Sequence, residues 1–149
     1  MEKTIIRITE VFLIGLWVGC ASVPMATKEE DKTAKHFAPS VGFAKVYIFR
    51  PSAIVGSAIA LQVSVDGKNV GSTRTGTFIV CEMLPGYHTV TSNAFDGFAS
   101  ISIRVQSHEL YFIEQSRKTL KVGGGHKLTL VDDSKGKTEV KKYKLVKAD

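Results

Sequence analysis

The sequence predicts an all-β protein: an antiparallel β-sandwich of about eight strands that follows an N-terminal signal segment. Two segments, Leu61–Val65 and Ser100–Val105, alternate apolar and polar residues with the period of two that is typical of a strand with one buried face. Asp66-Gly67 and Asp96-Gly97 are dipeptides that favour tight hairpin turns, because both residues tolerate positive φ angles.

The other six strands are predicted where β-branched and aromatic residues gather. They are, in chain order, Lys45–Phe49, Thr77–Met83, Tyr87–Phe95, Leu110–Ser116, Lys127–Val131 and Val140–Val146. Pro85-Gly86 marks a turn between two of them, since proline presets the φ angle of one turn position and glycine suits the next. Residues 132–137, Asp-Asp-Ser-Lys-Gly-Lys, are expected to form the last hairpin loop.

Residues 1–19 are predicted to be a signal peptide. Basic residues precede an uncharged apolar run, Val11–Val18, which is about 12 Å long as a helix and too short to span a bilayer. The Gly19-Cys20 pair that follows resembles the lipobox of bacterial lipoprotein signals, in which the cysteine thiol receives a diacylglycerol and the chain is cut before it. Cys20 is therefore the predicted site of lipid attachment. The alternative is a short buried strand or helix that carries an ordinary apolar cysteine.

The predicted localisation follows from the same segment. Ala21, in place of an aspartate after the cysteine, resembles signals that are sorted onward to the outer membrane. We therefore expect a lipid-anchored protein of the cell envelope, held at the outer membrane and facing the periplasm. A cysteine with several acyl chains would anchor the protein firmly without a spanning helix.

Two further segments complete the predicted domain organisation. Residues 20–40 are polar and charged without an apolar period, which indicates a flexible tether. A short helix over Lys28–His36 is the alternative for this stretch. Residues 41–147 are predicted to form the β-sandwich domain, because 149 residues suffice for one domain and hardly for two.

The net charge of +6 lies at the C-terminal end. Residues 117–149 contain ten Lys or Arg against four Asp or Glu, so this stretch accounts for the whole surplus. The lysines near the end of the chain are Lys135, Lys137, Lys141, Lys142, Lys144 and Lys147. They are expected to protect an edge strand from unwanted pairing, or else to attract anionic lipid or wall polymer.

The sequence contains few residues that indicate chemistry. The histidines, with no pair at a metal-binding spacing, are His36, His88, His108 and His126. His88 is the best candidate for a role, and we expect its ring to bond a neighbouring backbone group. Cys81 lies in an apolar strand and is expected to behave as a small buried hydrophobe. With Cys20 lipidated, it has no partner for a disulfide.

Five segments follow one another in a characteristic order: Tyr47–Pro51, Val65–Lys68, Gly76–Phe78, Leu84–Val90 and Leu110–Phe112. Together they resemble a family of bacterial lipoproteins known as domain of unknown function 2846. The resemblance covers about residues 44–146, and its Pro-Gly-x-His segment also looks like PEGA-type surface modules. It implies a β-sandwich on a lipid tether, with no established activity and no catalytic residues to carry over.

These observations favour a non-enzymatic structural or interaction module. We expect no catalytic residues, no cofactor, no metal and no nucleic-acid partner, and we expect the partner to be the membrane together with an envelope protein or a wall polymer. The alternative is a periplasmic or surface protein that binds a small or anionic ligand. For that alternative, Gly123–Lys127 could cradle an anion with backbone N–H groups, although the segment lacks the ending of a phosphate loop. A flexible hairpin connection is the simpler reading of this segment.

Overall fold

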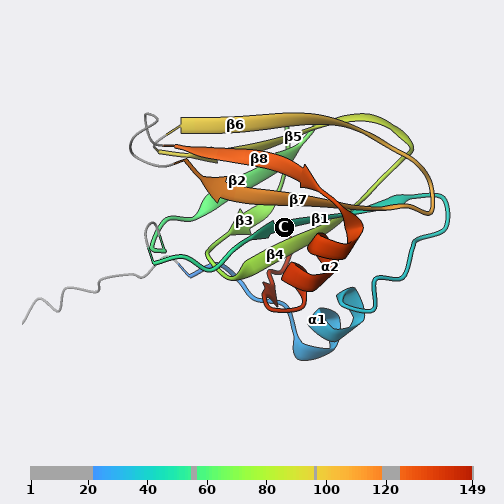
Figure 1. Cartoon of the computed structure of the whole chain (residues 1–149), viewed down its shortest axis with the longest axis horizontal. Coiled ribbons are helices and arrows are strands. Elements are labelled where there is room, and N and C mark those ends of the chain that lie inside the picture. The colour runs from blue at the N-terminus through green and yellow to red at the C-terminus, as the bar shows by residue number, and fades with distance from the viewer. Residues whose placement is uncertain (1–21, 55–56, 96, 119–124, 149) are drawn as a thin grey trace, which may run out of the picture.

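The computed structural model describes residues 22–54, 57–95, 97–118 and 125–148. Within these residues the chain forms nine strands and two short helices (Figure 1). The strands are β1 (Ala44–Arg50), β2 (Leu61–Val65), β3 (Lys68–Thr73), β4 (Thr77–Met83), β5 (Gly86–Ala94), β6 (Gly97–Val105), β7 (Leu110–Arg117), β8 (His126–Val131) and β9 (Lys144–Leu145). The helices are α1 (Lys28–Ala34) and α2 (Asp133–Val140).

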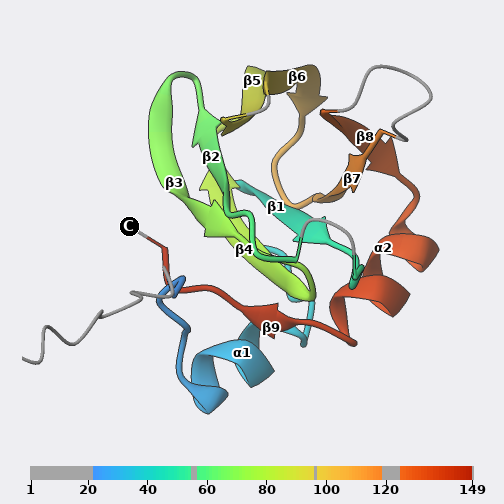
Figure 2. The ribbon, with the colours of Figure 1, turned by 90° about the vertical axis from the view of Figure 1, so that its left-hand side faces the viewer.

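The strands form two sheets that pack face to face, which confirms the predicted all-β sandwich. One sheet has the order β8-β7-β1-β4-β9, and the other has the order β3-β2-β5-β6. All pairs in the four-stranded sheet are antiparallel. In the five-stranded sheet β1 pairs with β4 and β7 with β8 in antiparallel fashion, whereas the β1–β7 and β4–β9 pairs are parallel. Both helices lie on the outer side of the five-stranded sheet (Figure 2).

An aliphatic core lies between the two sheets. Val46, Ile48 and Ile113 reach it from the five-stranded sheet, and Val63 and Val90 reach it from the other, each with no exposed surface. In β2 and β6, the residues that alternate with the core residues face away from this core, as the apolar and polar alternation predicts. Burial of each such side chain stabilises the fold by about 1.5–3 kcal/mol, so the alternating strands define this core.

A second, aromatic core lies beneath the two helices. Tyr47, Phe49, Phe78 and Phe112 from the outer face of the five-stranded sheet are buried there. The rings of Tyr47 and Phe112 stack with centroids 5.0 Å apart, and the Tyr47 hydroxyl donates to the Ala34 carbonyl at 2.8 Å. Nearly every residue of β1 is therefore buried, because one face of the strand packs on a sheet and the other on helices.

The predicted last hairpin and last strand are wrong. Residues 133–140 form α2 instead, and only Lys144 and Leu145 form β9. The Asp132 side chain caps α2 by accepting a hydrogen bond from the Lys135 N–H at 2.9 Å. Gly136 contributed to the prediction of a turn, but the residue has a different role: a Cβ there would lie 2.1 Å from the Phe112 ring. The glycine lets the helix approach the sheet closely, which outweighs its poor helix propensity.

The segment before β1 contains the helix that was the alternative prediction for residues 28–36. A capping box between Thr27 and Glu30 begins α1. Before it, Val23 is buried in the aliphatic core, Met25 pairs with Val146, and the Pro24 carbonyl accepts from the Lys147 N–H at 2.9 Å. The described part of the predicted tether thus packs on the domain from Val23 onward.

Candidate functional site

The two ends of the sandwich present different groups. We define the turn end by the connections 41–43, 84–85 and 106–109, at the right of Figure 1, together with the 66–67 turn, which His88 links to the 84–85 connection. The loop end lies at the opposite side and comprises residues 51–54, 57–60, 74–76, 95, 97–98, 117–118 and 125. The strand registers place Arg50 opposite Thr77 and Arg117 opposite His126 at the loop end.

His88 joins two turns at the turn end. Its Nδ1 lies 2.6 Å from Asp66 Oδ2, and its Nε2 lies 2.7 Å from the Leu84 carbonyl oxygen. Since both partners are acceptors, only the doubly protonated imidazolium donates to both at once. The expectation that His88 bonds a neighbouring backbone group is confirmed, and Asp66 is the partner that sequence reasoning missed.

The pKa values of this pair shift in opposite directions. The hydrogen bond to Asp66, and then the one to the Leu84 carbonyl, raise the pKa of His88 above its ordinary 6.5. The backbone N–H of Thr89, 2.8 Å from Asp66 Oδ1, and the His88 ring lower the pKa of Asp66 below its ordinary 3.8. Both ring nitrogens of His88 are thus engaged between the two turns, which leaves neither free to act as a general base.

A buried polar network forms the floor of the loop end. Gln115 is 1% exposed and receives a hydrogen bond from Thr73 Oγ1 at 2.5 Å, while its Nε2 donates to Ser92 Oγ at 2.9 Å. The ring of buried His126 lies 2.9 Å from the Ser92 carbonyl through Nε2. These four residues come from four strands in both sheets, so the network joins the sheets beneath the loops.

Arg50 fastens the long connection of the loop end to the end of β1. The side chain is 3% exposed at the end of β1, and its Nη1 donates to the Ile59 carbonyl at 2.7 Å. A buried guanidinium needs such acceptors, since its five N–H groups cannot be satisfied by apolar neighbours. The connection between β1 and β2 is thereby held near the sheet at its second half.

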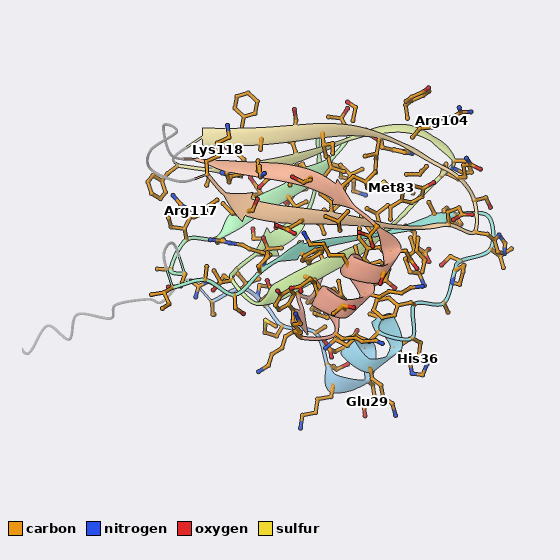
Figure 3. The ribbon with its side chains drawn as sticks, viewed as in Figure 1. Glu29, His36, Met83, Arg104, Arg117 and Lys118 are labelled. Carbon is orange, nitrogen blue, oxygen red and sulfur yellow. The ribbon has the colours of Figure 1, made fainter. Side chains whose placement is uncertain are left out.

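Large apolar side chains project from the loop end. Ile54 is 95% exposed, and Phe95 and Phe98 at the tip of the β5–β6 hairpin are 87% and 75% exposed. Arg117 and Lys118 stand at the same end, where β7 terminates (Figure 3). Exposed aromatic groups bordered by cations are typical of interaction surfaces rather than of catalytic clefts.

The turn end also exposes apolar groups, but acidic residues accompany them. Val41 is 82% exposed and Leu84 is 63% exposed. The connections nearest to them carry Asp66 and Glu109, and they contain no Lys or Arg. Lys68 at the start of β3 and Arg104 near the end of β6 are also exposed here, so the turn end carries charges of both signs.

The remaining predicted residues take structural positions. Cys20, the predicted lipid site, lies outside the described residues. Cys81 in β4 packs against the aliphatic core, and burial raises the pKa of its thiol to about 12, so the thiolate is scarce at neutral pH. His36 and His108 are both exposed, and His108 adopts a φ of 65° in the turn before β7.

The proposed anion loop is only partly described. Gly123 and Gly124 lie outside the described residues, whereas Gly125 has a φ of 83° just before β8. His126 turns inward to the polar network, and Lys127 is exposed on the other face of the strand. The described part thus aims its imidazole at the core rather than at a ligand.

Three of the six C-terminal lysines pair with acids in or near α2. Lys135 bonds Glu114 at 2.7 Å, and Lys142 bonds Glu139 at 2.6 Å. Lys137 bonds Asp133 one helical turn away at 2.7 Å. Most of these lysines therefore lie on or just after a helix, and only Lys144 lies on an edge strand, the position for which edge protection was predicted.

One surface pocket, of about 340 Å³, lies between α1 and β9. Met25, Lys28 and Lys144 line it, and the Asp31 carboxylate at its wall accepts from the Leu145 N–H at 2.7 Å and from Lys35 Nζ at 2.7 Å. One oxygen of Asp31 thus joins α1 to β9, and the other pairs with Lys35 at the end of the same helix. In the described part of the chain, no three His, Cys, Asp or Glu gather as metal ligands, and no helix is long and apolar enough to cross a membrane.

Two sequence comparisons bear on this arrangement. Residues 40–126 match the family described as "Protein of unknown function (DUF2846)". The match runs from just before β1 to the first residue of β8 and so includes most of both sheets. An "Uncharacterized protein" of Haemophilus influenzae is 32% identical over 127 residues, which are 85% of this chain and 75% of that protein.

Proposed function

The chain belongs to the DUF2846 family of proteins of unknown function, and from this premise we propose that it is a lipid-anchored protein of the cell envelope. In this proposal Cys20 carries the lipid, and the domain faces the periplasm from the outer membrane. The domain acts as a non-enzymatic structural or interaction module, with an envelope protein or wall polymer as its partner.

The observation that carries the proposal is where the folded domain starts relative to Cys20. Every described core residue lies between Val23 and Val146, so removal of residues 1–19 would leave all described core contacts in place. Only Ala21 and Ser22 separate Cys20 from Val23. Cleavage before Cys20 would therefore produce a new N-terminus that directly precedes the domain.

The short spacing also limits how far the domain could move from the membrane. Three residues span about 10 Å when fully extended. A lipid on Cys20 would hold the surface around buried Val23 within that distance of the headgroups. The domain would then lie against the bilayer in a restricted orientation, which suits a module that presents a surface to its partner.

The contacts of the titratable side chains support a non-enzymatic role. His88 is held between two acceptors, the Cys81 thiol has a raised pKa, and the His126 ring is buried against the Ser92 carbonyl. The two histidines thus make structural contacts, and the thiol stays protonated at neutral pH. Among the described residues, Ser107 Oγ lies 3.4 Å from His108 Nδ1 and Ser40 Oγ donates to Glu82, but both contacts are exposed on the surface rather than buried.

The proposal is tested by intact mass and membrane fractionation of the chain expressed in a Gram-negative host. We expect wild type to lose residues 1–19, gain the mass of the lipid and sediment with outer membranes. Cys20→Ala should be unlipidated, whereas Cys81→Ala, which removes the other cysteine, should be processed as wild type. A wild-type chain that is uncleaved, unmodified and soluble would overturn the proposal.

A further inference from the structure

We propose that the loop end is a second, non-covalent membrane contact, in which Ile54, Phe95 and Phe98 insert among anionic phospholipids. The inference deepens the proposed function and rests on it, since a lipidated chain is already held beside a bilayer. It assigns to these side chains a role that neither folding nor the lipid anchor requires of them.

The apolar surface of the loop end consists of protruding side chains, which suits contact with a lipid bilayer. Ile54 comes from the β1–β2 connection, and Phe95 and Phe98 come from the β5–β6 hairpin, so the three project from separate connections. Their exposures of 95%, 87% and 75% show that they protrude rather than line a groove. Protruding aromatic and aliphatic groups enter the boundary between headgroups and acyl chains without needing matched pockets.

Buried hydrogen bonds lie beneath the loop end that carries these groups. Gln115 joins both sheets under the loop end through Thr73 and Ser92. Arg50 fixes the second half of the β1–β2 connection through the Ile59 carbonyl. The polar groups beneath the loop end are thus bonded to one another, and the exposed apolar tips belong to neither core cluster.

Charge favours the loop end as the side that meets the membrane. Lys118 and Lys127 are exposed at or beside the loop end, and Arg117 ends β7 there. Anionic headgroups attract such side chains within a Debye length of the surface. At the turn end the acids Asp66 and Glu109 offset the exposed Lys68 and Arg104, so the same headgroups attract that end less strongly.

The position of the anchor agrees with this orientation. The described chain starts, in blue, at the left of Figure 1, on the same side as the loop end. A lipid on Cys20, within about 10 Å of Val23, would bring this side of the domain to the bilayer. One membrane plane can thus receive the lipid and the apolar tips together.

The test uses residues 22–149, which contain every described core residue and no tryptophan, because the single tryptophan of the chain is Trp17. Phe98→Trp places a fluorophore at the loop end, and Leu84→Trp places the matched control at the turn end. Both variants are mixed with vesicles of phosphatidylethanolamine and phosphatidylglycerol, with or without brominated acyl chains, after their thermal unfolding has been checked.

We expect the emission of Phe98→Trp to shift to the blue and to be quenched by the brominated chains, while that of Leu84→Trp stays unchanged. Adding Phe95→Ser to Phe98→Trp should weaken vesicle binding at least about tenfold, since one of the two aromatic groups at the hairpin tip is removed. No shift for Phe98→Trp, or equal shifts at both ends, would overturn the proposal. A shift only in membranes that contain their native proteins would also overturn it, in favour of a protein partner.

The charge argument has its own pair of variants. Lys118→Glu should reduce the binding of Phe98→Trp to anionic vesicles about fivefold to tenfold, and high salt should remove the difference. Lys68→Glu, an exposed lysine beside the turn end, should leave binding unchanged. Equal losses from both variants would show a non-specific charge effect and would contradict the assignment to the loop end.

The outcome is separable from that of the proposed function. If Cys20 proves unlipidated but Phe98→Trp still inserts into vesicles, the loop end is a membrane contact of a peripheral protein. If Cys20 carries its lipid but Phe98→Trp does not respond, the anchor stands and the second contact is refuted.

Discussion

The turn end and the loop end of the sandwich differ in where their side-chain hydrogen bonds lie. At the turn end, short connections are joined by side-chain bonds, with His88 held between Asp66 and the Leu84 carbonyl. At the loop end, the bonds are buried in the floor around Gln115, and the surface above carries apolar groups that make no contribution to either core. The comparison indicates that side-chain bonds at the turn end stabilise the fold, whereas the loop end exposes apolar side chains that a partner could contact.

The largest expected effect lies in the floor of the loop end. Gln115→Leu would leave the Thr73 and Ser92 hydroxyls without their partner, and we expect unfolding in urea to show a loss of about 2–4 kcal/mol, since each buried unsatisfied group costs about 1–3 kcal/mol. The triple variant Gln115→Leu, Thr73→Val, Ser92→Ala should recover most of the lost free energy of unfolding. Gln62→Leu on an exposed face of β2 is the control.

If Gln115→Leu were as stable as wild type, the network would not join the sheets, and the contrast between a bonded floor and a free surface would fail. The triple variant separates the cost of unpaired polar groups from the cost of altered packing, because only the first is removed with the partners.

An intermediate effect is expected at the turn end, and it depends on pH. The pKa of His88 is raised in the fold, so its contribution is complete below pH 6.5 and is lost as the pH rises through the folded value. The pKa of Asp66 is lowered, so its contribution is present above pH 3.8 and is lost as the pH falls through the folded value. The contact between His88 and Asp66 is therefore strongest between these limits.

Because the Asp66 side chain is 51% exposed, we expect its contact with His88 to contribute less than about 1 kcal/mol. NMR titration of the His88 ring would measure its pKa directly. Asp66→Asn keeps an acceptor for the Thr89 N–H and tolerates the φ of 50°, so it should lower the pKa of His88 without breaking the turn. An unchanged pKa of His88 in this variant would show that the pair is not coupled.

The smallest effect on stability is expected from the apolar tips of the loop end. Phe95→Ser and Phe98→Ser should each change the free energy of unfolding by no more than about 0.5 kcal/mol, as surface substitutions do. Leu84→Ser at the turn end is the matched control, and thermal unfolding is the measurement. A loss of several kcal/mol at Phe98 would mean that its ring packs in the fold and is not reserved for a partner.

The strands with one wet face were predictable from sequence, whereas burial on two faces was not. In β6, Ile101 and Ile103 face the core while Ser102 faces solvent, and the alternation alone shows this. In β1, Tyr47 and Phe49 alternate with Val46 and Ile48, and all four are apolar. Only the helices on the outer face explain why the strand lacks a polar side.

The candidate site was less predictable than the fold. His88 was recognisable because it follows a Pro-Gly turn, but its partner Asp66 is 22 residues away in the chain. The loop end joins residues from β3, β5, β7 and β8, and no spacing in the sequence connects Thr73 with Gln115. Exposed phenylalanines in a strand also look like core residues until the register places them at a hairpin tip.

The sequence by itself determined which segments alternate, where positive φ angles allow tight turns, and which cysteine follows an apolar run, because these are properties of neighbouring residues. Only the tertiary structure decided that residues 133–140 form a helix. Gly136 is compatible with a turn in this segment. The close approach of α2 to Phe112, however, needs a residue without a side chain at this position. Packing and buried hydrogen bonds depend on segments that meet only in the fold, and no local pattern contains them.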